Sequence, residues 1–169
     1  LLTCCLLAIF FSASVVGSLA AQERAVRPIT NNSGSVGVSD KRQALVIGNS
    51  EYEHAGRLRN PVNDAKAIGS TLQRLGFRVT LLMDADQRRM ENTIRDFGDQ
   101  LRQRKGVGLF YYAGHGMQLN GENYLLPTDI NPSSEEDVRY DAIPLGKLLA
   151  QMQVAKNTMN VVILDACRN

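Results

Sequence analysis

Short apolar runs alternate with segments of helical spacing along the chain after residue 40. Four runs of Val, Ile, Leu, Ala and aromatic residues have the length of a buried strand and end at polar residues or glycine. These runs cover residues 44–48, 77–83, 107–112 and 161–164. A shorter run at residues 124–126, preceded by Gly121, predicts an edge strand or hairpin.

The segments between the runs predict amphipathic helices. Apolar residues recur there at steps of three or four, as one face of a helix requires. We expect helices over residues 61–75, 86–103 and 144–153, with Pro61 in a first turn and Gly76 as a stop. The acidic residues 135–137 are expected to form a solvated loop. Strands that alternate with helices predict an α/β fold, a three-layer αβα sandwich around a mainly parallel sheet.

The first 40 residues differ from this body. Residues 1–20 carry no charge and end in small residues, which predicts a signal peptide cleaved after Ala20 and an exported, secreted or periplasmic protein. An uncleaved membrane anchor is the alternative. Residues 21–40 have no apolar period and predict a flexible linker, so the folded domain is expected over residues 41–169. Because the first residue is Leu, we also expect the natural reading frame to begin further upstream.

Charge and cysteine content exclude several classes of function. The formal net charge is +2, and the 19 basic and 17 acidic residues are interspersed, so no nucleic-acid footprint is visible. Cys4 and Cys5 would leave with the signal peptide, which makes Cys167 the one cysteine of the mature segment. A disulfide framework is then excluded, and two histidines with one cysteine do not predict a zinc site.

Two residues at the ends of apolar strands have the chemistry of a nucleophile and its base. The run at 161–164 leads to Cys167, and the run at 107–112 leads to His115. A free thiol ionises near pH 8.5, so a thiol nucleophile needs a base such as an imidazole to take its proton. The carboxyl ends of parallel strands share one edge of a sheet, where we expect the two side chains to meet. The alternatives are a buried packing cysteine and a hydrogen-bonded turn histidine.

Several motifs together resemble those of caspases, metacaspases and their bacterial relatives. Residues 165–168 read Asp-Ala-Cys-Arg, and Cys167 follows His115 by 52 residues, similar to the caspase spacing. Three further parts of the chain match motifs of these families and follow the same order along the sequence. They are residues 44–49 followed by 58–65, residues 110–116 and residues 124–129. The resemblance covers about residues 41–169 and implies a caspase-like large-subunit domain. It implies a cysteine endopeptidase with His115 and Cys167 as the catalytic dyad, and with the amides of Gly116 and Cys167 as the oxyanion hole.

The same resemblance implies a basic substrate. Metacaspases line the pocket for the residue before the cut with acidic side chains, and the matching positions here are Asp64 and Asp165. Two partly desolvated carboxylates favour Arg or Lys. The alternatives are a helix-start residue for Asp64 and a strand-end turn residue for Asp165.

The expected partners follow from the family. They are protein or peptide substrates with basic residues and the small-subunit region of the same precursor, with a membrane only if the N-terminal segment is uncleaved. No metal or cofactor is assigned, although calcium activates many metacaspases. Because the sequence reaches only to Asn169 and does not show the small-subunit part that the resemblance implies, we expect an incomplete sheet with residues 161–164 as an open edge, and weak activity of this polypeptide alone. The rival interpretation is an inactive caspase-fold interaction or signalling module.

Overall fold

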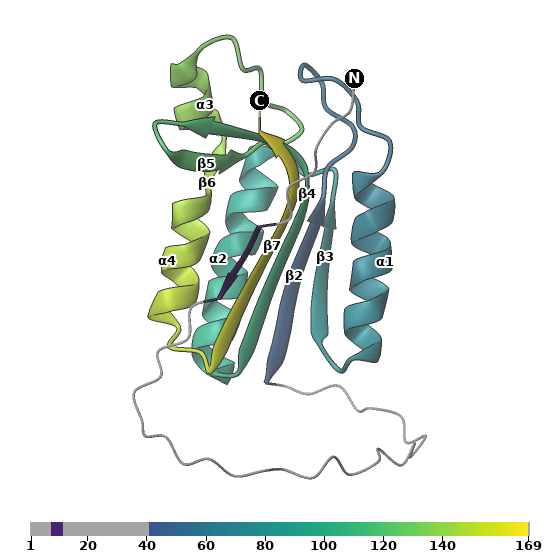
Figure 1. The fold of residues 1–169 in the computed structure, drawn as a ribbon, viewed down its shortest axis with the longest axis vertical. Coiled ribbons are helices and arrows are strands. Elements are labelled where there is room, and N and C mark those ends of the chain that lie inside the picture. The colour runs from purple at the N-terminus through teal and green to yellow at the C-terminus, as the bar shows by residue number, and fades with distance from the viewer. Residues whose placement is uncertain (1–7, 12–40, 169) are drawn as a thin grey trace, which may run out of the picture.

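The structure, a computed structural model, describes residues 8–11 and 41–168. The predicted signal peptide and linker lie outside the described residues, apart from the short strand β1, Ala8–Phe11. The chain folds into the expected α/β sandwich around a mainly parallel sheet of order β1-β7-β4-β2-β3 (Figure 1). The parallel strands are β2 (Arg42–Gly48), β3 (Arg78–Met83), β4 (Val107–Leu119) and β7 (Met159–Arg168).

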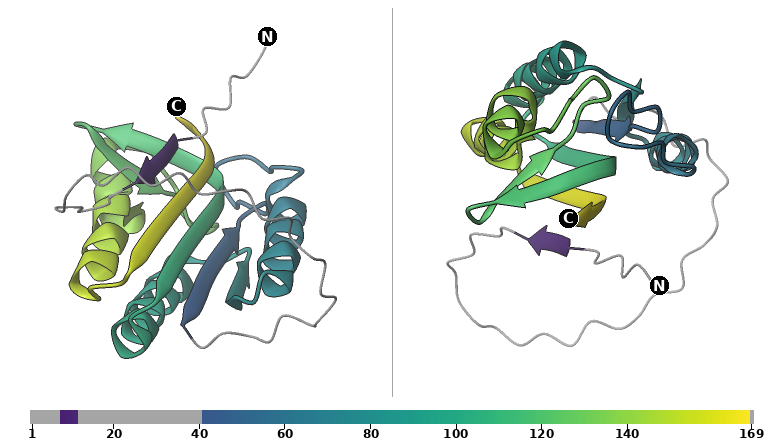
Figure 2. Two further views of the ribbon diagram at one scale, coloured as in Figure 1. Left: turned by 60° about the horizontal axis from the view of Figure 1, so that its bottom comes forward. Right: turned by 90° about the horizontal axis from the view of Figure 1, so that it is seen from above.

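Helices cover both faces of this sheet. The helix α1 (Pro61–Arg74) packs on one face, and α2 (Gln87–Arg104) and α4 (Leu145–Val154) pack on the other (Figure 2). The apolar positions of α2 that the sequence places at helical spacing are all buried in the second layer. The predicted three-layer arrangement is therefore confirmed.

Local signals explain where the helices begin. The Asp86 carboxylate accepts a hydrogen bond of 2.7 Å from the Arg89 N–H and so caps α2. Pro61 occupies the first turn of α1, as predicted. The predicted loop around residues 135–137 is wrong, because Ser134 caps a short helix there, α3 (Glu135–Asp141). The three acidic residues of its first turn favour this helix by complementing its dipole.

Two strands are longer than the apolar runs predict. β4 continues through the glycine-rich segment to Leu119, because β5 (Glu122–Leu125) pairs with it antiparallel once β2 has ended. The short strand β6 (Ile143–Pro144) pairs antiparallel with β5 and extends this part of the sheet. β7 follows β4 in register as far as Arg168. Periodicity alone misses both extensions, since small and polar residues interrupt the apolar runs there.

The expectation of an open edge at residues 161–164 is wrong for the described residues. β1 pairs antiparallel with this part of β7, from Ala8 opposite Leu164 to Phe11 opposite Val161. An edge strand exposes unpaired N–H and C=O groups, and an antiparallel neighbour satisfies those that face it. The backbone of the strand that leads to Cys167 is therefore paired on both sides along residues 161–164.

Two glycines provide a paired test of the packing between β2 and α1. A Cβ on Gly48 would lie 2.5 Å from the Pro61 carbonyl oxygen and 2.7 Å from the Ala65 Cβ, so the helix would have to move. A Cβ on Gly69 would meet only ordinary contacts at 3.6 Å or more. We predict that Gly48→Ala lowers the free energy of unfolding by about 1–3 kcal/mol. The control Gly69→Ala should raise it by up to about 1 kcal/mol, because alanine favours a helix. Urea unfolding measures both values, and a change of the same sign in both variants would contradict this packing.

Candidate active site

Strand register brings His115 and Cys167 together. In the parallel pair of β4 and β7, His115 lies directly opposite Cys167. Neighbouring strands lie about 4.8 Å apart, so the two backbones are adjacent. Both residues belong to the paired strands, in the last part of β7 and in the part of β4 beyond its apolar run.

The His115 ring is held by the loop that follows β2. Its Nε2 lies 2.9 Å from the carbonyl oxygen of Gly56, and its ring contacts that of Tyr52 edge-on, with centroids 4.6 Å apart at 61°. A carbonyl oxygen can only accept a hydrogen bond, so we assign the ring proton of the neutral imidazole to Nε2. The Nδ1 lone pair is then free to accept a proton.

The backbone of His115 is held by two tyrosine hydroxyls. The His115 N–H donates to the Tyr52 hydroxyl at 2.8 Å, and the Tyr112 hydroxyl donates to the His115 carbonyl at 2.7 Å. Both rings are buried, with Tyr112 fully enclosed. Gly114 makes room for them, because a Cβ there would lie 2.5 Å from the Tyr52 hydroxyl and 2.6 Å from that of Tyr112.

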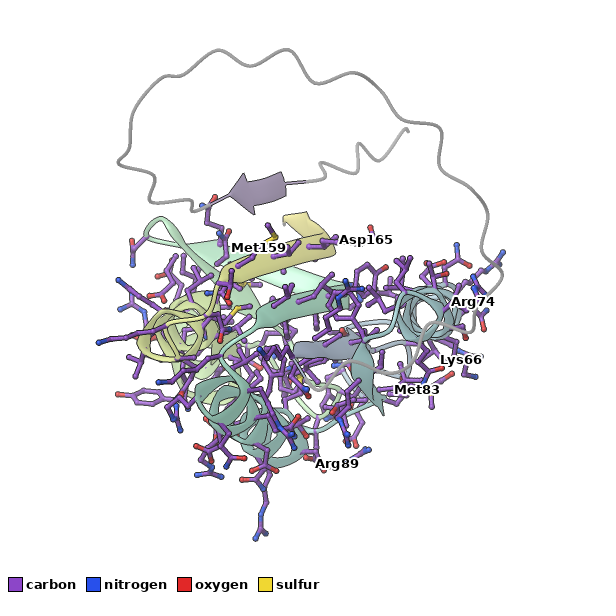
Figure 3. All side chains as sticks on the ribbon, turned by 90° about the horizontal axis from the view of Figure 1, so that it is seen from below. Lys66, Arg74, Met83, Arg89, Met159 and Asp165 are labelled. Atoms are coloured by element: carbon purple, nitrogen blue, oxygen red, sulfur yellow. The ribbon has the colours of Figure 1, made fainter. Side chains whose placement is uncertain are left out.

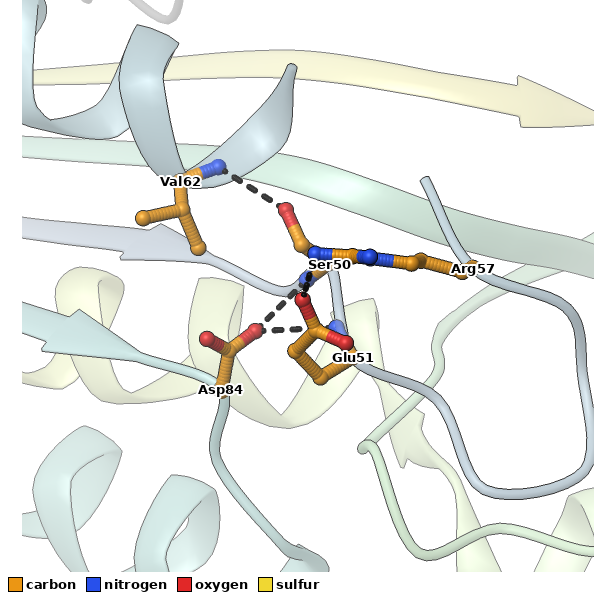
Figure 4. Close-up of polar contacts among 5 residues, drawn as sticks. All are labelled: Ser50, Glu51, Arg57, Val62 and Asp84. Carbon is orange, nitrogen blue, oxygen red and sulfur yellow. Dashed lines mark hydrogen bonds and ion pairs between the residues drawn. The ribbon is translucent and has the colours of Figure 1, made fainter. Parts of the chain in front are cut away.

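The loop that carries Tyr52 and Gly56 is itself anchored at its base. The Asp84 carboxylate accepts the backbone N–H groups of Ser50 at 2.7 Å and Glu51 at 3.0 Å (Figure 4). The Ser50 hydroxyl accepts the Val62 N–H at 3.2 Å, which joins the loop to the start of α1. Glu51 also pairs with Arg57 at 2.6 Å across the loop. These bonds anchor an otherwise largely exposed loop to β3 and α1.

The backbone N–H of Gly116 points from β4 toward the end of β7. The Leu126 N–H donates to the His115 carbonyl at 3.1 Å, which makes His115 and Leu126 a hydrogen-bonding pair. The next pair, Gly116 and Leu125, is therefore of the type that does not exchange hydrogen bonds. The Gly116 N–H consequently points away from β5 and toward the β7 side, where Arg168 is its register partner.

Asp64 and Asp165 both act on the phenol of Tyr111. The Tyr111 hydroxyl lies 3.5 Å from Asp165 Oδ2. Burial raises the pKa of Tyr111 well above 10, and the charges of Asp165 and Asp64 raise the pKa further. Asp165 lies on β7, on the face of the sheet that α1 covers (Figure 3). Lys66 and Arg74, labelled in the same view, show the position of α1. Both carboxylates are half-buried, and within the described residues neither has a basic partner at ion-pair distance.

The second histidine, His54, does not join this cluster. It is half-exposed and lies 3.9 Å from Glu53. No group of three or more His, Cys, Asp or Glu residues suited to a metal ion occurs among the described residues. In the same part of the chain, no helix is long and apolar enough to cross a membrane.

Sequence reasoning missed the tyrosines and the loop carbonyl around His115. Tyr111 and Tyr112 belong to the run at residues 107–112, which predicts only a buried strand, and Tyr52 and Gly56 have no motif of their own. One signal was available, because neighbouring residues of a strand point to opposite faces. Tyr111 and Tyr112 therefore reach opposite sides of β4, one toward Asp165 and one toward the His115 backbone. The contacts of Tyr52 and Gly56 depend on the loop conformation, which local sequence does not determine.

The fold and register define an α/β domain that places one cysteine beside one histidine at the carboxyl edge of its sheet. Residues 41–169 match the family model described as the Caspase domain. The chain belongs to this caspase family of cysteine peptidase domains, so the resemblance inferred from the sequence motifs is confirmed.

Named relatives agree with this assignment. The chain is 35% identical over 127 residues to human mucosa-associated lymphoid tissue lymphoma translocation protein 1, covering 74% of this chain and 15% of that protein. It is 27% identical over 136 residues to the Dictyostelium discoideum protein named paracaspase, covering 78% of this chain and 32% of the relative. The chain thus spans less than a third of the length of either curated relative.

Solved structures confirm the fold. The Drosophila initiator caspase Dronc superposes with a TM-score of 0.55 at 13% identity, over 88% of this chain and 57% of Dronc. Protein GSU0716 from Geobacter sulfurreducens gives a TM-score of 0.54 at 19% identity, over 75% of this chain and 50% of that protein. At these identities the likeness concerns the fold alone.

The buried tyrosines around the site predict a loss of stability at alkaline pH. Burial raises the pKa values of Tyr52, Tyr111 and Tyr112 above the ordinary value of 10.0. The contribution of these neutral phenols to the free energy of unfolding is complete below pH 10.0. It is lost as the pH rises above that value, because the tyrosines of the unfolded chain ionise first. We expect the free energy of unfolding to fall from about pH 10 upward. Urea unfolding across this range, with phenolate absorbance recorded in parallel, tests it. Complete ionisation of all tyrosines in the folded protein near pH 10 would contradict the prediction.

Proposed function

We propose that this domain is a cysteine endopeptidase that hydrolyses peptide bonds through a dyad of Cys167 and His115. The observation that carries this proposal is the register of His115 opposite Cys167, together with the Gly56 carbonyl on the histidine Nε2. That carbonyl fixes the tautomer in which Nδ1 can accept a thiol proton. Membership of the caspase domain family supports the same reaction.

The reaction can be written for these residues. The Cys167 thiol gives its proton to His115 Nδ1, and the thiolate attacks the carbonyl carbon of the scissile bond. The N–H groups of Gly116 and Cys167, which the family resemblance assigns to the oxyanion hole, would leave the paired ends of β4 and β7 to stabilise the resulting oxyanion. His115 then protonates the leaving amine as the C–N bond breaks and a thioester remains. Water, deprotonated by His115, hydrolyses the thioester and restores the thiol.

A peptidyl-arginine chloromethyl ketone tests the proposed nucleophile. We predict that one equivalent adds to Cys167 in a Cys4→Ser, Cys5→Ser background, and that mass spectrometry of the digested protein locates the adduct there. His115→Ala should slow the reaction by about 10²- to 10⁴-fold, the usual contribution of a general base.

Cys167→Ala is the control and should abolish labelling. An adduct on another residue, or labelling that persists in this control, would contradict the assignment. A chain that reacts with neither the ketone nor any peptide would favour the inactive interaction module.

We propose further that the site prefers Arg or Lys before the cut. Asp64 and Asp165 support this proposal, since both half-buried carboxylates lie close enough to Tyr111 to raise its pKa. A guanidinium can bind a carboxylate through two parallel hydrogen bonds, and such charged bonds are stronger than neutral ones. The Tyr111 hydroxyl, which lies 3.5 Å from Asp165, would help to orient that carboxylate.

A panel of fluorogenic peptides that differ only in the residue before the cut measures this preference. We predict that kcat/KM is highest for Arg and Lys and that Asp165→Asn lowers the Arg value by about 10- to 100-fold, the loss of one charged hydrogen bond. The control Asp96→Asn removes an exposed carboxylate on α2, across the sheet from α1, and should leave the panel unchanged. A parent protein that prefers Asp over Arg would rule out this specificity.

A further inference from the structure

His115 and Leu126, the backbone pair next to the β4–β5 ladder, share one hydrogen bond instead of two. The Leu126 N–H donates to the His115 carbonyl at 3.1 Å, and in a regular antiparallel pair the His115 N–H would donate back to the Leu126 carbonyl. The His115 N–H donates to the Tyr52 hydroxyl instead, at 2.8 Å. The same hydroxyl lies 3.3 Å from the Leu126 carbonyl oxygen, to which it can donate. The Tyr52 hydroxyl thus takes the place of the backbone hydrogen bond from the His115 N–H to the Leu126 carbonyl.

The Tyr112 hydroxyl completes this arrangement. It donates to the His115 carbonyl at 2.7 Å and lies 3.0 Å from the Leu126 carbonyl and 3.2 Å from the Tyr52 hydroxyl. Burial raises the pKa of both phenols, so both keep the proton that these bonds require. Every backbone polar group of His115 is therefore bound to a group whose own position is fixed by burial.

The imidazole depends on the same loop as its backbone. Tyr52 supplies the ring that contacts His115, and Gly56, four residues later, supplies the carbonyl at Nε2. A shift of the Tyr52 hydroxyl would therefore move the backbone of His115 relative to the carbonyl that fixes its tautomer. Gly114 permits the close approach, because a side chain there would collide with both hydroxyls.

We propose that Tyr52 and Tyr112 are positioning residues for His115. Their hydroxyls bind the backbone N–H and C=O of His115 so that Nε2 stays on the Gly56 carbonyl and Nδ1 stays open to Cys167. The two tyrosines act through His115 and take no part in the proton transfers themselves. This inference rests on the proposed dyad.

Tyr52→Phe tests the hydroxyl while keeping the ring against the imidazole. In the parent chain we expect the ¹⁵N chemical shifts of His115 at neutral pH to report a single tautomer protonated at Nε2. In Tyr52→Phe, and in Tyr112→Phe, we expect a mixture of both tautomers. Tyr140→Phe is the matched control, because Tyr140 is 79% exposed and lies on α3, and its His115 spectrum should equal that of the parent.

Kinetics provide a readout that a purely structural role would not move. We expect Tyr52→Phe to lower kcat on an arginyl peptide by about 10- to 100-fold, since a small misplacement of a catalytic group has effects of this size. KM should stay within about twofold, because neither tyrosine is placed in the substrate site. Tyr140→Phe should keep both constants.

Two outcomes separate this inference from the proposed function. A Tyr52→Phe chain with a lower melting temperature but an unchanged His115 tautomer and kcat would overturn the positioning role. A parent chain that cleaves no peptide would overturn the proposed function. In that case the tautomer comparison still decides whether the hydroxyls orient His115.

Discussion

The site depends on one replaced hydrogen bond. The Tyr52 hydroxyl takes the place of a backbone hydrogen bond between His115 and Leu126. A buried N–H or C=O without a partner costs about 1–3 kcal/mol, so a strand can leave regular pairing only where another group satisfies it. The two tyrosines meet this requirement in a protein interior that excludes water. They allow His115 to lie within a paired strand and still present its imidazole to the loop above.

The Leu126 carbonyl connects the hydrogen bonds of His115 to the rest of the fold. It accepts the side-chain amide of Asn49 at 3.2 Å and lies 3.3 Å and 3.0 Å from the hydroxyls of Tyr52 and Tyr112. Asn49 is fully buried at the end of β2 and also accepts the Ala85 N–H at 3.1 Å, after β3. One polar cluster thus joins the ends of β2, β3 and β5, and the geometry around His115 follows from the packing of the whole sheet.

Sequence reasoning predicted the framework better than the contacts. The helices, the parallel strands and the pairing of His115 with Cys167 follow from apolar periodicity and from the rule that strand ends share an edge. The helix after Ser134 was missed, because its cap and acidic first turn were interpreted as a solvated loop. The tyrosine contacts were missed because they join residues about 60 positions apart through a loop whose conformation depends on Asp84. Strand pattern and motif spacing carry no information on such contacts.

The pH dependence of Cys167 alkylation tests the central claim most directly, because it reports the thiolate without requiring a substrate cleft. The measurement compares the chain with its His115→Ala variant, both in a Cys4→Ser, Cys5→Ser background, over the range from acid to alkaline pH. If His115 takes the thiol proton, the parent reacts well below pH 8.5, and the variant reacts with the profile of an ordinary thiol near that value. Identical profiles in the two proteins would contradict the dyad.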